Sequence, residues 1–354
     1  MKSKKKVLLG LSGGVDSSVA AVKLLEQGYD VTGIYMKNVD GPDTDYLAAK
    51  EVADSLGIRL IKAELRDKFK NKVIKHFLEG FENGITPHPC VVCNREFKFK
   101  AFMDYVKEEN FDYLSMGHYA RIKHENGKSY LLKGVDPSKD QTYFLCLLSQ
   151  EQVSHTLFPV GEMKKTEVRK FAKEKNLFTA EKKDSLDVCF VNTTNFSDYL
   201  LEELGKKPGW MVTPSGVKIK KHNGIYFYTI GQRKGLEVGG MPEYEEKPWY
   251  VVGKNIEKNE LIIDQGLDSS SLLSRSLIIE KPNWITDTPL ENKEYEAKFR
   301  YRGKTSTVTV EYLSDGSAKI NFPQGAKAIT LGQACVLYDG DIVLGGGEIT
   351  TINK

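Results

Sequence analysis

This 354-residue chain has no long apolar run, no even set of cysteines and no strong net charge. No stretch approaches the roughly 20 apolar residues that a membrane-spanning helix needs, so we expect no membrane partner. The five cysteines are sparse and odd in number, which argues against a disulfide-stapled secreted fold and favours thiols in a reducing cytoplasm. The net charge of +3 identifies no partner. The sequence also shows no repeats or low-complexity tracts, and its length allows two or three globular domains.

The first apolar run ends in a glycine-rich turn. Residues 7–11 suit a strand that is covered on both faces. Gly13 and Gly14 lack bulk, so backbone N–H groups of the turn can close on a ligand. Ser17 and a second apolar run then begin a helix, whose N-terminus attracts phosphate. Asp16 lies in the same turn, and an acid beside a phosphate indicates Mg²⁺ or an orienting role.

This turn differs from two common phosphate-binding loops. It has neither the Gly-Lys-Ser/Thr ending of a Walker A loop nor the Gly-x-Gly-x-x-Gly of a dinucleotide fold. An ordinary strand–helix turn without a ligand is the plain alternative. The whole string from Gly10 to Ser17 resembles the PP-loop of the ATP pyrophosphatases, which split ATP into AMP and pyrophosphate to activate a carbonyl oxygen. The resemblance implies ATP with Mg²⁺ and an adenylation reaction.

Strand and helix patterns alternate over about the first 135 residues. Strand-like runs lie at 30–36, 58–63 and 113–118, and helical patterns lie at 46–56 and 68–81. The alternation predicts an α/β fold with a doubly wound parallel sheet. Ligands gather at the carboxyl ends of such strands. Met36 and Gly117 are therefore expected at the same edge as the glycine-rich turn.

From about residue 204 the glycines, aromatics and β-branched residues increase. We expect an α/β catalytic domain over 1–203, a small central β-rich domain over 204–274 and a C-terminal β-barrel over 275–354. The central all-β segment includes 226–235. The later strands are predicted at 277–279, 295–302, 306–312, 318–322, 334–338 and 342–348. Arg300 and Tyr301 place a base beside an aromatic ring, as an RNA surface would, although a solvated edge strand would look much the same.

Two of the cysteines form a Cys-x-x-Cys, Cys90 and Cys93, after a pair of prolines. The simplest interpretation of this motif is one half of a zinc site. The sequence has no second Cys-x-x-Cys and no His pair at zinc spacing that would supply the other half. A redox role needs a low thiol pKa, which a helix N-terminus with basic residues beside it would supply. Cys189 follows an acidic turn and is the candidate second thiol, whereas Cys146 lies in an apolar run and is expected to be buried. The helix predicted at 164–175 has a Lys and Arg face that solvation alone would explain.

The order and joint occurrence of these motifs, over essentially the whole chain, resemble one family. This family is the tRNA-specific 2-thiouridylases, which replace the O2 of the wobble uridine with sulfur. The resemblance is carried by residues 10–17, 89–94, 116–119, 139–145, 184–185 with 189–190, 229–236 and 332–333. It implies a tRNA uridine sulfurtransferase that adenylates O2 with ATP and receives persulfide sulfur from a sulfur-relay or cysteine desulfurase protein. It also implies tRNAs with Lys, Glu and Gln anticodons as partners.

The resemblance also implies roles for individual residues. The catalytic residues would be Cys93, Cys189 and Asp16. Cys93 would be the nucleophile, and Cys189 would carry the persulfide sulfur. The ATP-binding residues would be Gly10, Leu11, Ser12, Gly13, Gly14, Val15, Asp16, Ser17, Met36 and Gly117. The tRNA-binding residues would be His88, Pro89, Cys90, His118, Lys139, Asp140, Gln141, Arg300, Tyr301 and Gln333. The first three of these would line the flipped target base.

Three alternatives stay open at this point. The Cys-x-x-Cys with Cys90 would also suit an iron–sulfur cluster, which we rank below a persulfide relay. A PP-loop amidotransferase or ligase, such as GMP or NAD synthetase, would need an ammonia source, and the chain shows no glutaminase-like nucleophile. An RNA-binding or sulfur-carrier protein that had lost catalysis would not need Asp16 and both thiols.

Overall fold

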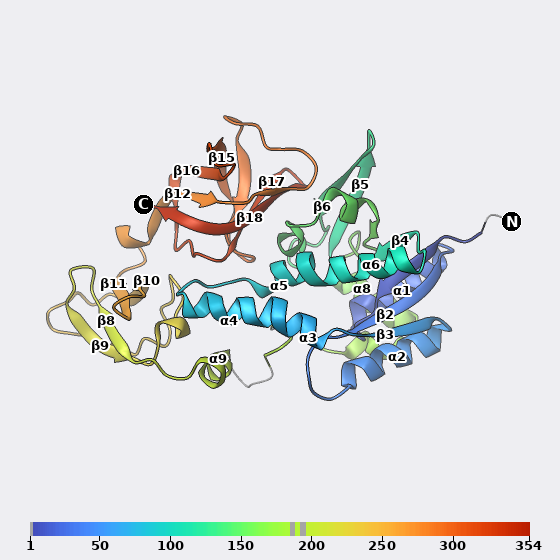
Figure 1. Ribbon diagram of the computed structural model, residues 1–354, viewed down its shortest axis with the longest axis horizontal. Helices are drawn as coiled ribbons and strands as arrows, with labels where there is room; N and C mark the ends of the chain where they lie inside the picture. The colour runs from blue at the N-terminus through green and yellow to red at the C-terminus, as the bar shows by residue number, and fades with distance from the viewer. Residues whose placement is uncertain (1–2, 185–187, 192–195) are drawn as a thin grey trace.

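The first apolar run folds as β1 (Lys6–Gly10), the middle strand of a five-stranded sheet in the order β3-β2-β1-β4-β7 (Figure 1). The computed structural model describes residues 3–184, 188–191 and 196–354, so Ser185 of the resemblance lies outside the described residues. The other strands are β2 (Asp30–Lys37), β3 (Arg59–Glu64), β4 (Tyr113–Ser115) and β7 (Thr156–Leu157). Neighbouring strands pair in parallel, which confirms the predicted doubly wound sheet.

Helices cover both faces of this sheet because β1 is apolar on both sides. Val7 and Leu9 pack into one core, and Leu8 packs into another. The first core is covered by α1 (Val15–Glu26), α2 (Thr44–Leu56) and α8 (Lys165–Glu174). The second is covered by α3 (Arg66–Phe69), η1 (Lys70–Ile74), α4 (Lys75–Glu82), α5 (Pro89–Val92), η2 (Cys93–Phe99) and α6 (Lys100–Glu108), of which η1 and η2 are π-helical. Further helical segments are η3 (Thr142–Leu145), α7 (Gln150–Ser154), η4 (Phe178–Glu181) and α9 (Phe196–Leu204).

The last strands close an antiparallel barrel in the order β12-β16-β15-β14-β17-β18, with β18 paired back to β12. Its strands are β12 (Leu273–Ile279), β14 (Tyr295–Lys298), β15 (Ser306–Tyr312), β16 (Ala318–Lys327), β17 (Ala334–Asp339) and β18 (Ile342–Asn353), and β13 (Asn283–Trp284) pairs with β18. Closure removes exposed strand edges and confirms the predicted barrel. The predicted strand at 295–302 ends early, because Arg300 and Tyr301 lie in a turn closed by the Gly303 N–H.

A hairpin of the α/β part reaches this barrel. It consists of β5 (Ala120–Glu125) and β6 (Lys128–Lys133), and Leu132 of β6 pairs with Ile342 of β18. Figure 1 shows the hairpin standing beside the barrel, above α6.

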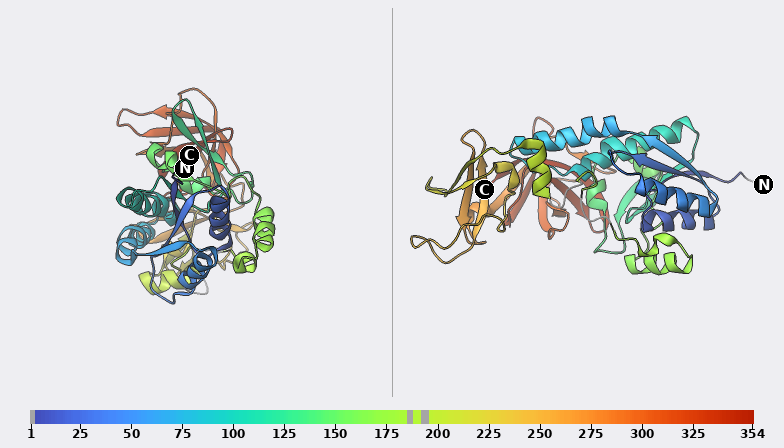
Figure 2. Two further views of the ribbon diagram at one scale, coloured as in Figure 1. Left: turned by 90° about the vertical axis from the view of Figure 1, so that its right-hand side faces the viewer. Right: turned by 90° about the horizontal axis from the view of Figure 1, so that it is seen from below.

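The central strands form a separate sheet at the end of the molecule far from the N-terminus (Figure 2). They are β8 (Gly209–Val212), β9 (Lys218–His222), β10 (Trp249–Asn255) and β11 (Glu260–Gln265), in the order β10-β11-β8-β9. Residues 226–235, expected within the all-β segment, form no strand. They contain most of the 3₁₀ turn η5 (Ile225–Phe227) and a turn in which Gly231 has a φ of +84° that opposes an extended backbone. The domain limits at 203/204 and 274/275 stay a prediction.

The barrel is docked onto the α/β part through a shared core. Val336 and Tyr338 of β17 belong to the same core as Leu8 of β1, whereas Cys335 and Leu337 point into the barrel. The linking segment η6 (Ser270–Leu272) precedes β12. Among the helices in the described ranges, none combines the length and the apolarity that a membrane crossing requires.

Candidate active site

The turn after β1 leaves the first amides of α1 open to a ligand. The Ser17 hydroxyl accepts from the Ser12 N–H at 3.2 Å and donates to the Gly14 carbonyl at 3.0 Å. These two bonds connect the start of α1 to the preceding residues of the turn. Helix α1 begins at Val15 without a side-chain cap. Its first N–H groups and the positive end of its dipole therefore suit a phosphate.

Two glycines let other elements approach this turn. Gly13 has a φ of +73°, and a Cβ there would lie 2.6 Å from the Asp45 carbonyl oxygen of α2. Gly117 follows β4, and a Cβ there would lie 3.0 Å from the Ser17 nitrogen. The structure thus brings Gly117 to the turn, and Met36 lies near the end of β2 at the same edge of the sheet. Their ATP contacts stay predictions.

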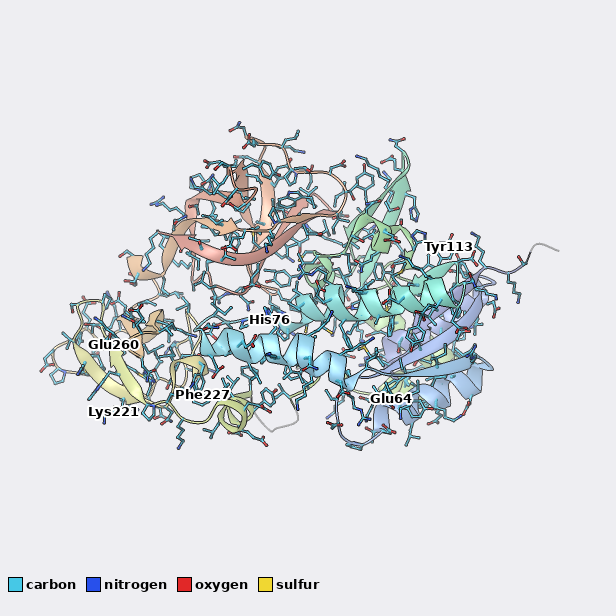
Figure 3. All side chains as sticks on the ribbon, viewed as in Figure 1. Glu64, His76, Tyr113, Lys221, Phe227 and Glu260 are labelled. Carbon is cyan, nitrogen blue, oxygen red and sulfur yellow. The ribbon has the colours of Figure 1, made fainter. Side chains whose placement is uncertain are left out.

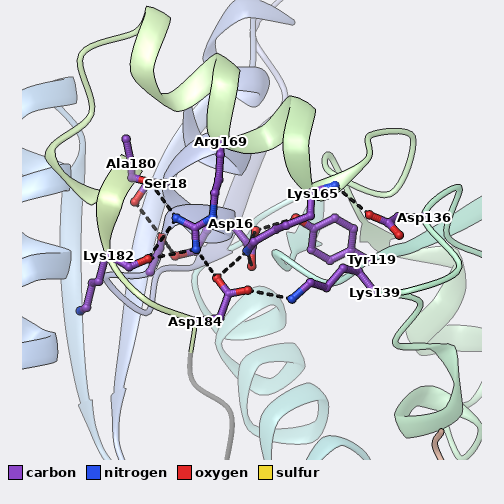
Figure 4. A network of polar contacts seen from close by, with 12 residues as sticks. Asp16, Ser18, Tyr119, Asp136, Lys139, Lys165, Arg169, Ala180, Lys182 and Asp184 are labelled. Atoms are coloured by element: carbon purple, nitrogen blue, oxygen red, sulfur yellow. Dashed lines mark hydrogen bonds and ion pairs between the residues drawn. The ribbon is translucent and has the colours of Figure 1, made fainter.

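Asp16 is held by a buried lysine whose importance sequence reasoning missed (Figure 4). Lys165 places its Nζ 2.7 and 2.8 Å from the two Asp16 carboxylate oxygens. Tyr119 donates its hydroxyl to Asp16 Oδ1 at 2.7 Å, and burial together with the Asp16 charge raises the pKa of Tyr119, which keeps it a donor. Lys165 is the first residue of α8, where its N–H donates to Asp136 at 2.9 Å. The basic face predicted at 164–175 is therefore not merely solvated, since Lys165 is only 9% exposed.

Asp184 extends this network to two more cations. Its carboxylate pairs with Lys139 at 2.8 Å, Lys165 at 2.9 Å and Arg169 at 2.7 Å. Burial raises the pKa of Asp184, but the bonds from Lys139 and Lys165 outweigh it and lower the pKa to about 2. The carboxylate is therefore ionised at neutral pH. Lys182, beside it, donates to the Gly13 carbonyl at 3.1 Å and so touches the glycine-rich turn.

Cys93 lies inside a continuous helical segment rather than at an open helix N-terminus. It begins η2 directly after α5 and is 6% exposed. Burial raises the pKa of Cys93 to about 12, and the nearby Lys98 charge offsets this only in part. The expected low thiol pKa is therefore wrong for this structure, because burial outweighs the neighbouring base. Burial also opposes the charge of Lys98, yet attraction to Cys93, Cys189 and Cys90 leaves the pKa of Lys98 raised.

Cys189 is exposed and lies within range of the Cys93 charge. Asn38, in the loop after β2, donates its side-chain amide to Cys189 Sγ at 3.6 Å. The second thiol thus lies near the carboxyl end of β2. Cys90, Cys93 and Cys189 each lie within the range over which a thiolate charge would affect the Lys98 ammonium. Asn38 was not predicted, and no local pattern marks it.

All five cysteines are free, and Cys146 is buried as predicted. Within the described ranges, no group of three or more His, Cys, Asp or Glu side chains is arranged to hold a metal ion. The three neighbouring thiols therefore do not form a ready-made cluster site in the structure.

His88 lines a cavity of about 550 Å³ between the helical segment and the barrel. Other lining residues include Lys72, Arg95, Gly332 and His76, which Figure 3 labels on α4. Burial lowers the pKa of His88 to about 4, so its ring is neutral at pH 7. Its Nδ1 has no hydrogen-bond partner among the described residues. The rings of His88 and Tyr301 lie 5.1 and 4.2 Å from the Phe144 ring, so a row of aromatic rings runs from Pro89 and Cys90 toward the barrel.

The other predicted tRNA contacts use their side chains within the protein. Lys139 pairs with Asp184, Asp140 accepts from the Thr142 hydroxyl at 2.9 Å, and Gln141 accepts from the Tyr119 N–H at 3.0 Å. Lys139 and Gln141 therefore contact members of the Asp16 network, whereas Asp140 accepts bonds at the start of η3. Their tRNA contacts stay predictions.

Of the three further predicted contacts, Arg300 and Gln333 lie at the domain junctions, and His118 lies inside the α/β part. Arg300 donates to the carbonyls of Ile230 and Ala328, and Gln333 donates to the Thr86 carbonyl at 2.7 Å. His118 is largely buried beside Phe99, and burial lowers its pKa to about 3. Arg300 and Gln333 thus bond across the junctions between the parts of the molecule. The tRNA contacts of all three residues stay predictions.

The fold and the site define an α/β nucleotide-binding domain with two appended β modules. The description "tRNA methyl transferase HUP domain" matches residues 5–193, "tRNA methyl transferase PRC-barrel domain" matches 197–265, and "Aminomethyltransferase beta-barrel domain" matches 274–349. The "tRNA-specific 2-thiouridylase MnmA" of Lacticaseibacillus paracasei is 47% identical over 354 residues, which cover 97% of this chain and 94% of that protein. Proteins of the same name from Lysinibacillus sphaericus (46%, 99% and 96% covered) and Pseudomonas syringae pv. syringae (45%, 98% and 94% covered) are similar to it as well. The chain belongs to the family of tRNA-specific 2-thiouridylases.

Proposed function

We propose that this chain replaces O2 of the wobble uridine of tRNA with sulfur, with ATP as the activating substrate and a cysteine persulfide as the sulfur source. The observation that carries the proposal is that two thiols from distant parts of the chain, Cys93 and Cys189, lie close enough for the charge of one to affect the other, in the same α/β part as a glycine-rich turn of the PP-loop type. The family descriptions mention methyl transfer, but the relatives along nearly the whole chain are named for thiolation. We therefore favour sulfur transfer.

The first half of the reaction, in which ATP activates the base, takes place at the turn after β1. The open amides at the start of α1 receive the phosphates, and Lys165 lies beside them to balance their charge. Asp16 is the carboxylate that would hold Mg²⁺, which neutralises phosphate charge when it accompanies ATP. Attack of uridine O2 on the α-phosphorus expels pyrophosphate, and N3 loses its proton. O2 thereby becomes part of an AMP leaving group.

The second half of the reaction, in which sulfur replaces the activated oxygen, is carried out by the two thiols. Exposed Cys189 accepts a persulfide from a donor protein, and the outer sulfur attacks C2 as AMP leaves. Cys93 then attacks the Cys189 sulfur, which forms a Cys93–Cys189 disulfide and frees the 2-thiouridine. The proton lost by Cys93 restores N3 of the base. An external thiol reductant returns both cysteines to the free state.

The test is reconstitution with the full chain. ATP, Mg²⁺, a persulfide-loaded donor and unmodified tRNA with a Lys, Glu or Gln anticodon are incubated with the protein, and 2-thiouridine and AMP are quantified by mass spectrometry. We expect equal amounts of both products. Cys93→Ala and Cys189→Ala should each abolish 2-thiouridine while tRNA still binds.

Cys335→Ala is the matched control, because Cys335 is buried inside the barrel away from both thiols. This variant should retain product formation. Thiolation by Cys189→Ala would refute its role as persulfide carrier. A wild-type protein that binds ATP and tRNA but makes no 2-thiouridine would refute the proposed function.

A further inference from the structure

The backbone at Cys189 is anchored in the core that also contains Cys93. Phe190, the next residue after Cys189, is 5% exposed within this core. Its ring centroid lies 5.8 Å from that of Phe69, which in turn lies 5.2 Å from that of Phe97. Phe97 belongs to η2, the helix that begins with Cys93. Packed aromatic rings therefore fix the backbone of the second thiol relative to the helix of the first.

The orientation of the Cys189 sulfur depends on a polar contact rather than on packing. Cys189 is exposed, so its neighbours do not choose among the staggered rotamers of its side chain. Among the described residues, the side-chain amide of Asn38 donates to this sulfur at 3.6 Å. A hydrogen bond favours the rotamer that brings the sulfur to the amide. The direction in which the sulfur points is therefore set by the place of Asn38.

The loop that carries Asn38 is itself held by a buried cation. Asn38 directly follows Lys37, which is only 7% exposed. The Lys37 Nζ donates to the Gly41 carbonyl at 2.9 Å and pairs with the Asp43 carboxylate at 2.8 Å. Lys62 of β3 donates to the same carboxylate at 3.0 Å. These bonds close the loop after β2 on the end of the strand, so the amide of Asn38 is presented from a defined position.

We propose that Asn38 is a positioning residue whose side-chain amide orients the Cys189 sulfur for exchange with Cys93. The charge of Cys189 contributes to the raised pKa of Cys93, so the two thiols lie within range of each other's charge. Asn38 also lies two residues after Met36, at the carboxyl end of β2. It thus holds the second thiol at the edge of the sheet where the nucleotide is expected. This inference rests on the roles of the two thiols in the proposed function and deepens it.

The experiment follows formation of the disulfide between Cys93 and Cys189 in the full chain, without ATP, tRNA or donor protein. Diamide, an azo oxidant, takes two electrons and two protons from the thiol pair and becomes a hydrazine. Tandem mass spectrometry under non-reducing conditions quantifies the linked peptides and distinguishes Cys93 from Cys90 as the partner. We expect Asn38→Ala to slow this disulfide about fivefold, the amount by which one ordinary hydrogen bond shifts an equilibrium.

Iodoacetamide labelling of Cys189 is the readout for access to the thiol. In Asn38→Ala it should stay near the wild-type rate, because the thiol is exposed with or without the amide. Slower disulfide formation with unchanged labelling is the signature of a misdirected sulfur. Loss of exposure at Cys189 would instead slow both reactions.

Three further variants separate the amide from the loop around it. Asn38→Gln keeps the amide on a longer side chain and should recover part of the wild-type disulfide rate. Asp40→Asn removes an exposed carboxylate of the same loop, which pairs with Arg66 at 2.8 Å, and should form the disulfide as the wild type does. Asn83→Ala removes an amide that donates to the Glu79 carbonyl on α4, and it should also match the wild type. Thermal unfolding and binding of a fluorescent ATP analogue are measured for every variant.

The outcomes separate the inference from the proposed function. An Asn38→Ala variant that forms the disulfide as fast as the wild type overturns the inference. So does an Asp40→Asn variant that slows it equally, since the effect then belongs to the loop as a whole, and so does a wild type in which diamide does not link Cys93 to Cys189. The 2-thiouridine assay decides the proposed function by itself. A wild type that makes no 2-thiouridine, while Asn38→Ala is still slow to form the disulfide, overturns only the proposed function.

Discussion

At the residue scale, the structure keeps its proposed nucleophile protonated. Burial raises the pKa of Cys93 to about 12, with Lys98 as the opposing charge. Only the thiolate reacts, so far below this pKa the rate should grow about tenfold with each pH unit. We predict that iodoacetamide labelling of Cys93 rises in this way from pH 7 to pH 9 without a plateau, as measured by mass spectrometry of its peptide.

The same experiment has a matched pair of variants. Lys98→Met should slow labelling of Cys93 at every pH, because it removes the charge that lowers the thiol pKa. Lys100→Met, an exposed lysine at the start of α6, should leave the rate near that of the wild type. A plateau below pH 9 would show that Cys93 ionises more readily than its burial allows.

At the element scale, the glycine-rich turn depends on how closely α2 approaches it. Gly13→Ala would place a Cβ 2.6 Å from the Asp45 carbonyl oxygen at a φ of +73°, so the backbone must move. Gly28→Ala is the matched control, since Gly28 has a φ of +84° and a Cβ added there would meet no atom within 4 Å. We predict a loss of about 1 kcal/mol in unfolding free energy for the control and a larger loss for Gly13→Ala.

The affinity for ATP should also differ between the Gly13→Ala and Gly28→Ala variants. Gly13→Ala should weaken binding of a fluorescent ATP analogue at least tenfold, because the turn that presents the α1 amides is displaced. Gly28→Ala should bind normally. Urea unfolding and fluorescence titration give both quantities, and equal effects of the two substitutions would contradict the packing argument.

Local patterns predicted the elements of this fold better than the partners of its side chains. The apolar run at 7–11 and its glycine-rich turn predicted β1 and the start of α1, because both depend on neighbours in sequence. Lys165 escaped prediction because its partner Asp16 is 149 positions away and no local pattern marks a lysine that will be buried. The prediction of a low pKa for the Cys93 thiol was wrong for a similar reason. The basic residue that lowers this pKa is visible in the sequence, whereas the burial that raises it is not.

At the scale of the whole molecule, the barrel and the α/β part form one structural unit while the central sheet has its own core. Asn283 of the barrel donates to the carbonyls of Cys146 and Leu148 at 3.1 and 3.0 Å. Val336 packs into the core of the helical segment that carries the thiols. A barrel held in this way fixes one wall of the cavity beside His88, which would suit the predicted entry of the target base there.

This arrangement predicts which parts of the molecule lose stability when one core residue is truncated. Val308→Ala in the barrel interior, where Val308 is 1% exposed, should cost about 2 kcal/mol. Because Val336 and Tyr338 of the barrel wall pack into the core of the α/β part, hydrogen exchange should show the slowest amides of β1 losing the same protection as those of β15. Val251→Ala, fully buried in the separate core of the central sheet, should lower protection in β10 and β11 and leave β1 unchanged. If β1 kept its protection in Val308→Ala, the barrel and the α/β part would be independent folding units, and the contacts of Asn283 and Val336 would join two bodies that unfold separately.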